Sequence, residues 1–204
     1  MRGMSVRLNK PKIKKYAKNK NKSKRKRWHA ILSRLKNNVP LLGAEIGIWN
    51  GSTSHNLLKA RPLLSLIMID PWLVPKTGSS YAKSDDDNAN KSQNEHDKSY
   101  RRTIDRVKFA GKRAIIKKMM SHEAVKQIKD DSLDFVFIDG DHSYDGCRKD
   151  IILWLPKIKI GGFISGHDYN HPRLPGVKKA VDEIFLKKHI ELDDNRTWFV
   201  RIYE

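Results

Sequence analysis

The chain has 204 residues, which is enough for one domain with a sizeable core and too few for two comfortable ones. Its formal net charge is +19, from 42 Lys and Arg against 23 Asp and Glu. Residues 1–38 hold 15 of the basic residues and no acidic one, because Glu45 is the first acid. The remainder has 27 basic against 23 acidic residues, so the basic character belongs to the N-terminal segment.

Composition disfavours secreted and membrane-spanning proteins. The single cysteine, Cys147, cannot form an internal disulfide, as a small secreted fold would require. There is no run of 18 apolar residues, so we expect no membrane span. The basic N-terminus also lacks the apolar stretch of a signal peptide. We therefore expect an intracellular, cytoplasmic protein.

The N-terminal segment differs in composition from the rest of the chain. Residues 1–26 are mainly Lys, Arg, Asn and Ser, with almost no side chains to bury, which predicts a disordered basic arm before a single domain over residues 27–204. Runs such as residues 24–27 bind polyanions without sequence choice. Non-specific nucleic acid or another polyanion is thus a predicted partner of residues 1–38, and a solubilising tail without a partner is the alternative.

In chain order, the first periodic segment is a helix, because Trp28, Ile31, Leu32 and Leu35 form one apolar stripe. Apolar runs then predict strands at residues 41–49, 63–69, 114–119, 133–138, 162–165 and 197–203. Helical patterns lie between them, at residues 52–60, 123–128, 144–155 and 177–185, and in a segment that follows residue 98 and ends at residue 110. Residues 74–98 read as a long polar loop. Alternation of strands and helices predicts an α/β fold of the doubly wound, mostly parallel type.

Acidic residues follow four of the first five predicted strands. They are Glu45, Asp70, Asp139 with Asp141, and Asp168, while Ser121 and His122 follow the third strand. Ligands of an open parallel sheet bind outside the carboxyl ends of its strands, near the point where strand order reverses. The sequence therefore predicts one site at this edge of the sheet.

The turn after the first strand has the pattern Glu45-x-Gly47-x-Trp49-x-Gly51. Trp49 stands where a dinucleotide fold has its second glycine, which argues against a pyrophosphate ligand. Asp70, 23 residues after Gly47, is well placed to accept both ribose hydroxyls of a nucleoside. For the glycines alone, an ordinary strand-to-helix turn is the alternative interpretation.

Three segments resemble a known family: residues 43–47 (GAEIG), 69–72 (IDPW) and 137–144 (FIDGDHSY). With residues 154–156 and 161–169, they are similar to the class I methyltransferases, and among these to the small-molecule and sugar O-methyltransferases of the macrocin type. The resemblance covers roughly residues 40–185 and leaves out the arm. It implies a seven-stranded Rossmann-like sheet with an antiparallel last strand, and S-adenosylmethionine as the cofactor.

Carried over by position, the resemblance implies a role for each matching residue. Cofactor-binding residues would be Glu45, Gly47, Trp49, Gly51, Asp70, Ser121 and Asp139. In metal-dependent members, the fourth-strand acid and two acids after the fifth strand bind a divalent ion, here Asp139, His167 and Asp168. His167 replaces an acid of the macrocin type, which places Mn²⁺ beside Mg²⁺ as a candidate.

Methyl transfer to oxygen requires an in-line acceptor and a group that removes its proton, because the cofactor already carries an electrophilic methyl. A metal would lower the pKa of the hydroxyl, and the predicted catalytic residues are Asp139, Asp141 and His142. Alternatively, Asp141 or Ser143 caps the helix that begins near Tyr144, and His142 is a core residue. We interpret residues 85–87 as a solvated loop face.

The sequence thus predicts an enzyme that methylates a hydroxyl of a small molecule or sugar. A nucleic-acid methyltransferase that uses the basic arm is one alternative, although the domain lacks the Asn-Pro-Pro-Tyr type of motif. A non-catalytic nucleic-acid-binding protein with a methyltransferase-like fold is another. The sequence leaves the acceptor and the oligomeric state open.

Overall fold

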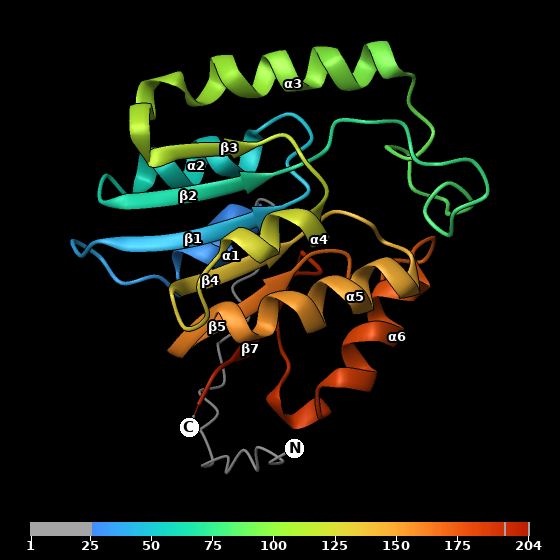
Figure 1. The fold of residues 1–204 in the computed structure, drawn as a ribbon. Coiled ribbons are helices and arrows are strands. Elements are labelled where there is room, and N and C mark those ends of the chain that lie inside the picture. Colours follow the sequence, from blue (N-terminus) through green and yellow to red (C-terminus); the bar gives the residue numbers. More distant parts are fainter. Residues whose placement is uncertain (1–25, 194, 204) are drawn as a thin grey trace, which may run out of the picture.

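The computed structural model describes residues 26–193 and 195–203. It consists of one sheet with helices on both faces (Figure 1). The seven strands are β1 (Leu41–Ile46), β2 (Leu64–Ile69), β3 (Ala114–Lys117), β4 (Leu133–Ile138), β5 (Ile158–Gly166), β6 (Glu191–Leu192) and β7 (Trp198–Arg201). The predicted arm falls outside the described residues, except for Lys26.

Among the described residues, six α-helices and four short 3₁₀ helices precede or connect the strands. The α-helices are α1 (Arg27–Leu32), α2 (Ser52–Ala60), α3 (Gln93–Val107), α4 (Ser121–Ala124), α5 (Tyr144–Trp154) and α6 (Pro175–Ile184). The 3₁₀ helices are η1 (Lys108–Arg113), η2 (Val125–Gln127), η3 (Leu155–Lys157) and η4 (Lys187–His189). Among the described helices, none has the length and apolar character needed to cross a bilayer.

The order of the strands is β3-β2-β1-β4-β5-β7-β6. Strands β1 to β5 pair in parallel, whereas β7 is antiparallel to both β5 and β6. The chain moves outward from β1 through β2 to β3, and then returns to place β4 on the other side of β1. The strand order therefore reverses between β1 and β4, where a doubly wound sheet binds its ligand. The predicted fold class is confirmed.

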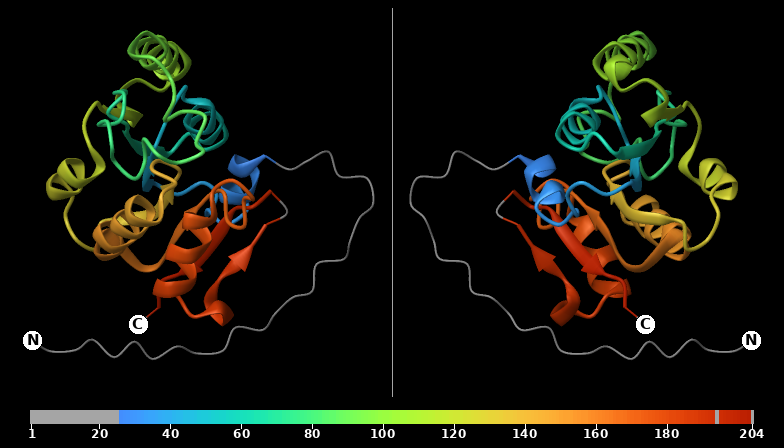
Figure 2. Two further views of the ribbon diagram at one scale, coloured as in Figure 1. Left: turned by 90° about the vertical axis from the view of Figure 1, so that its right-hand side faces the viewer. Right: turned by 90° about the vertical axis from the view of Figure 1, so that its left-hand side faces the viewer.

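Alternate residues of the strands build two hydrophobic cores, because successive side chains of a strand point to opposite faces. On one face, Leu66, Phe135 and Phe137 pack with α1, α2 and the end of α3. On the other, Ile46, Val136 and Ile138 pack with α4, α5 and α6. Figure 2 shows the two helical layers on either side of the sheet.

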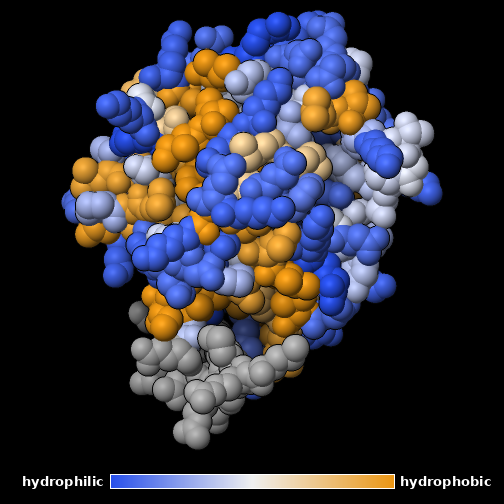
Figure 3. Space-filling view, in the orientation of Figure 1, coloured by the Kyte–Doolittle hydropathy of each residue, from blue (hydrophilic) through white to orange (hydrophobic). Residues whose placement is uncertain are grey.

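Some apolar side chains stay at the surface. Figure 3, in the orientation of Figure 1, shows hydrophobic groups interspersed with hydrophilic ones. The most exposed large apolar side chains are Ile160, Leu186, Leu192, Leu73 and Leu63. Scattered apolar exposure of this kind is ordinary for a folded chain.

The predicted elements agree with the structure at their centres and differ at their ends. The fourth predicted strand coincides with β4, and the fifth is longer than predicted. The first strand was expected to reach residue 49 but ends at Ile46, because Gly47 and Trp49 have φ of 82° and 51° and bend the chain. β6, with only two residues, was not predicted at all.

The polar segment after β2 is partly helical, which corrects the prediction of a loop up to residue 98. α3 begins at Gln93, and Ser92 and Glu95 form a capping box there. The Ser92 side chain accepts a bond from the Glu95 N–H, and the Glu95 side chain accepts one from the Ser92 N–H. These two bonds satisfy donors that the first turn of a helix otherwise leaves unpaired.

Gly43 offers a stability test of the contact between β1 and β4. A Cβ built on Gly43 would lie 2.1 Å from the Phe135 ring. We expect Gly43→Ala to lower the free energy of unfolding by about 1–3 kcal/mol through overpacking, measured by urea denaturation. Adding Phe135→Leu should remove part of that loss, because the shorter side chain leaves room. Additive effects of the two substitutions would contradict this account.

Candidate active site

The turn after β1 is held in shape by the side chain of Asp70. Asp70 Oδ2 accepts hydrogen bonds from the backbone N–H of Ile48 and of Trp49, each at 2.9 Å. Its Oδ1 accepts one from Trp72 N–H at 2.7 Å. Trp49 and Trp72 both have positive φ, which is uncommon for bulky residues, so the carboxylate stabilises two strained positions.

Gly47 brings the ends of β1 and β4 into close contact. A Cβ at this position would lie 2.2 Å from the backbone oxygen of Asp139, so only glycine fits. Gly47 N–H also donates to the Ile69 carbonyl at 2.9 Å, and Asp139 N–H donates to the Ile46 carbonyl at 2.8 Å. The ends of three neighbouring strands are thus bound together at the reversal point.

Two cavities, each of about 620 Å³, open on this edge of the sheet. We call them the Asp70 cavity and the Asp168 cavity after one residue that lines each. Their walls share four residues: Gly47, Trp49, Asn88 and Asp139. A ligand in one cavity can therefore approach a ligand in the other across the turn after β1.

The Asp70 cavity extends from the turn to the start of α4 and the middle of α5. Ser121 lines it, as predicted for a cofactor contact, and its hydroxyl donates to Asp150 Oδ1 at 2.6 Å. Trp154 Nε1 donates to the Ser121 oxygen at 2.8 Å. Asp150 is almost completely buried, and this burial raises its pKa to about 7. The far end of the cavity thus carries a buried acid that the sequence analysis did not single out.

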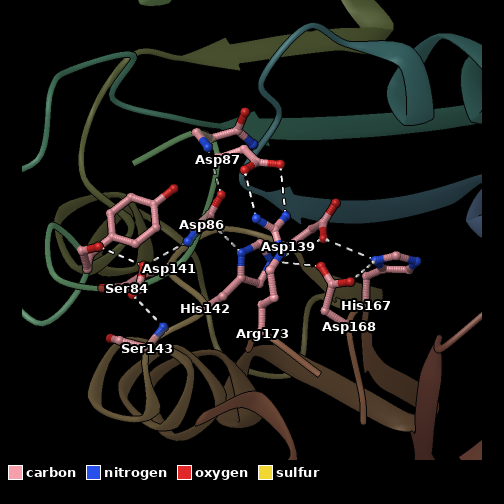
Figure 4. A network of polar contacts seen from close by, with 12 residues as sticks. Ser84, Asp86, Asp87, Asp139, Asp141, His142, Ser143, His167, Asp168 and Arg173 are labelled. Carbon is pink, nitrogen blue, oxygen red and sulfur yellow. Dashed lines mark hydrogen bonds and ion pairs between the residues drawn. The ribbon is translucent and has the colours of Figure 1, made fainter. Parts of the chain in front are cut away.

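His142 lines the Asp168 cavity and lies in the middle of a network of polar contacts (Figure 4). Its Nδ1 lies 2.5 Å from Asp86 Oδ2, and Asp86 is only 5 % exposed. Its Nε2 lies 3.4 Å from both Asp139 Oδ1 and Asp168 Oδ2. Asp86 therefore sets the orientation of the ring, so that the second nitrogen faces two carboxylates.

Residues 85–87 were interpreted as a solvated loop face, and for Asp86 this prediction is wrong. The loop after β2 folds back over the site and buries Asp86 against His142. Asp87 stays exposed and forms a two-pronged ion pair with Arg173, at 3.0 and 2.9 Å. Sequence spacing could not reveal this contact, because Asp86 and His142 are 56 positions apart.

Arg27, the first residue of α1, reaches into the same cavity. Its guanidinium donates a hydrogen bond to Asp139 Oδ2 and forms an ion pair with it. Burial lowers the pKa of Arg27, while Asp168 and Glu45 act in the opposite direction. A cation thus already contacts the carboxylate that was predicted to bind a metal.

Asp168 and His167 form a second acid–imidazole pair. His167 Nδ1 lies 3.0 Å from Asp168 Oδ1 and 3.9 Å from Asp139 Oδ1. Although burial opposes it, the neighbouring His167, His142 and Arg27 lower the pKa of Asp168 to about 2. Burial also lowers the pKa of His167, while Asp168 acts in the opposite direction.

Other residues of the predicted site have different surroundings. Glu45 is 1 % exposed and lines the Asp168 cavity, with Ser54 Oγ donating to it at 2.5 Å. Burial raises the pKa of Glu45 to about 7. Gly51 lines neither cavity. It precedes α2 with φ of 73° and packs against Thr103 of α3. Its contact with the cofactor stays a prediction.

Asp141 lies on the side of the Asp70 cavity and not in the wall of the Asp168 cavity. Its Oδ1 accepts from Ser143 N–H at 2.9 Å, and Ser143 in turn caps α5 by accepting from Gly146 N–H. Burial raises the pKa of Asp141. Ser143 is therefore the residue that caps α5, and Asp141 binds the N–H of that cap residue.

Known proteins are similar to this chain in both sequence and fold. The methyltransferase domain family matches residues 44–169, which include the carboxyl ends of β1 to β5. The chain belongs to the S-adenosylmethionine-dependent methyltransferases. An uncharacterised protein of Acanthamoeba polyphaga mimivirus is 27 % identical over 154 residues, which are 71 % of this chain and 61 % of that protein. The resemblance inferred from the sequence is confirmed.

Solved structures share the fold of this methyltransferase. The O-methyltransferase NovP aligns with a TM-score of 0.61 and 18 % identity, over 87 % of this chain and 76 % of its own. The calicheamicin methyltransferase CalS11 aligns with a TM-score of 0.63 and 13 % identity, over 85 % and 76 %. A putative caffeoyl-CoA O-methyltransferase from Staphylococcus aureus aligns with a TM-score of 0.56 and 13 % identity, over 87 % of this chain and 80 % of its own. At these low sequence identities, the similarity establishes a shared fold and nothing about the substrate.

Asp150 predicts a pH dependence of stability. Its pKa is about 7 in the folded state against an ordinary value of 3.8, so between these values the folded chain binds more protons than the unfolded one. Stability from this residue is therefore lost as the pH rises. We expect the wild type to lose about 2 kcal/mol relative to Asp150→Asn between pH 5 and pH 8, measured by urea unfolding. Parallel pH profiles of the two proteins would contradict this.

Proposed function

We propose that this protein transfers the methyl group of S-adenosylmethionine to a hydroxyl oxygen of a small molecule. One observation carries the proposal: two cavities of equal size meet at Gly47, Trp49 and Asp139, and one of them contains a carboxylate–imidazole cluster. The cofactor would occupy the Asp70 cavity and the acceptor the Asp168 cavity. Methyl transfer requires such a junction, because the acceptor oxygen must lie in line with the methyl group.

The Asp70 cavity suits a nucleoside. Its wall combines the turn after β1, Asp70 at the end of β2 and Ser121 at the start of α4. The resemblance implies that Asp70 contacts the ribose and that Ser121 lies near the adenine. The turn holds Trp49 where a pyrophosphate-binding fold has glycine, which fits a ligand without phosphate. Gly47, Trp49, Asp70, Ser121 and Asp139 line this cavity and stay predicted cofactor contacts. Glu45 lines the Asp168 cavity and Gly51 lines neither cavity, and the cofactor contacts expected of these two residues also stay predictions.

The Asp168 cavity suits a divalent cation. One ligand atom each of Asp139, His142 and Asp168 lies within 4.8 Å of the others. Asp86 pairs with Nδ1 of His142, on the other side of the ring from Nε2, as acidic side chains do behind metal-binding histidines. Two carboxylates and one imidazole are compatible with Mn²⁺ as well as Mg²⁺. A cation bound there would lower the pKa of the acceptor hydroxyl and position it.

We propose that the two histidines exchange the roles expected from the sequence. Asp141 or His142 was predicted to remove the proton, but Nε2 of His142 lies 3.4 Å from both Asp139 and Asp168 and is suited to hold a cation. His167 was predicted as a ligand, but its Nδ1 lies 3.0 Å from Asp168 Oδ1, and this pairing suits it to accept a proton from the acceptor hydroxyl. Both residues line the Asp168 cavity.

Oxygen as the methyl acceptor is supported by the structural neighbours. NovP is an O-methyltransferase, and CalS11 is described as a TDP-rhamnose 3′-O-methyltransferase. A small molecule fits a cavity of about 620 Å³. The predicted interaction of residues 1–38 with nucleic acid or another polyanion, and the cytoplasmic location, stay predictions.

Binding of S-adenosylhomocysteine tests the cofactor half of the proposal. We expect the wild type to bind it with micromolar affinity in isothermal titration calorimetry. Asp70→Ala should weaken this binding at least about tenfold, because the turn loses the acceptor of three N–H groups. Asp87→Asn, in an exposed ion pair outside the Asp70 cavity, should bind like the wild type. Absence of binding by folded wild-type protein would refute the proposal.

A titration with Mn²⁺ alone, followed by electron paramagnetic resonance, tests the assigned roles of the histidines. We expect His142→Ala to weaken Mn²⁺ binding at least about tenfold and His167→Ala to change it much less. Arg27→Gln should strengthen binding, because the cation no longer competes with the guanidinium for Asp139. The reverse order of the two histidine variants would restore the assignment made from the sequence.

A further inference from the structure

The hydrogen-bonding capacity of Asp70 is largely used within the protein. An ionised carboxylate offers about four lone-pair positions, and three backbone N–H groups occupy Asp70. The prediction that Asp70 accepts both ribose hydroxyls therefore exceeds what the carboxylate can offer. A ribose in this cavity needs a further polar partner for its second hydroxyl.

His96 is a buried polar group in the same cavity wall. It lies on the first turn of α3, is 6 % exposed and lines the Asp70 cavity. Neither ring nitrogen has a hydrogen-bond partner among residues 26–193 and 195–203. Leaving buried donors and acceptors unpaired costs about 1–3 kcal/mol each, so an unpaired imidazole in the wall of a cavity points to a ligand that binds against it.

The imidazole of His96 is fixed close to the turn that Asp70 organises. The Trp49 ring meets it edge-on, with 5.4 Å between the ring centroids. The preceding capping box and the bond from Gln93 Nε2 to the Trp72 carbonyl at 2.9 Å anchor this end of α3. His96 is also close enough to act electrostatically on the Asp70 carboxylate. Both side chains thus border the same part of the cavity.

We propose that His96 binds the ribose of the adenosyl ligand and shares its two hydroxyls with Asp70. This inference rests on the proposed function, because it assumes a nucleoside in the Asp70 cavity. One nitrogen of a neutral imidazole donates and the other accepts, and a hydroxyl group can do both. A vicinal diol therefore satisfies His96 and the remaining position of Asp70 together. The contact also couples α3, which follows the loop carrying Asp86, to cofactor binding.

The test compares S-adenosylhomocysteine with its 2′-deoxy and 3′-deoxy analogues by isothermal titration calorimetry. We expect His96→Phe to bind S-adenosylhomocysteine about tenfold more weakly than the wild type, as expected for one lost hydrogen bond. For one of the two deoxy analogues, the same substitution should change affinity less than about twofold. His96→Gln, which can still donate and accept, should restore part of the affinity for the full ligand.

His55→Phe is the matched control, because His55 lies on α2 and lines neither cavity. Thermal unfolding of each variant shows that the fold is intact. If His96→Phe binds S-adenosylhomocysteine like the wild type, or loses the same factor for all three ligands, the assignment of His96 is wrong and the proposed function stands. If the wild type binds none of the three ligands, the proposed function itself fails.

Discussion

The approach of Gly47 to the backbone of Asp139 determines the geometry of everything around it. The two residues directly follow the neighbouring parallel strands β1 and β4, and the absence of a side chain at Gly47 lets their backbones touch. Asp70, at the end of the strand on the other side of β1, then reaches the turn and binds its N–H groups. A larger residue at position 47 would separate the strand ends and open the junction between the two cavities.

Charge is balanced locally at this edge of the sheet. Asp86, Asp139 and Asp168 surround His142, and the Arg27 guanidinium contacts Asp139 from the other side. Closely spaced carboxylates repel one another unless cations or hydrogen-bond donors lie between them. The Arg27 guanidinium is such a cation in the Asp168 cavity.

Segments remote in sequence complete the site. The start of α1 contributes Arg27, the loop after β2 contributes Asp86, and α3 contributes His96. None of them belongs to a strand end, so the general rule for parallel sheets does not single them out. They lie in the walls of the two cavities at this edge of the sheet, so side chains outside the strand ends also shape the site.

The sequence alone determined the doubly wound sheet, the positions of β1 to β5 and the acids at their ends, because apolar runs and turn residues are local signals. It also indicated the methyltransferase family, since the residues at strand ends stand in characteristic short motifs. Only the tertiary structure decided which side chains meet. The pairing of Asp86 with His142, the contact of Arg27 with Asp139 and the unpaired ring of His96 depend on chain segments brought together by packing. Such contacts leave no periodic pattern in a sequence, because nothing in the local chain specifies a partner more than 50 positions away.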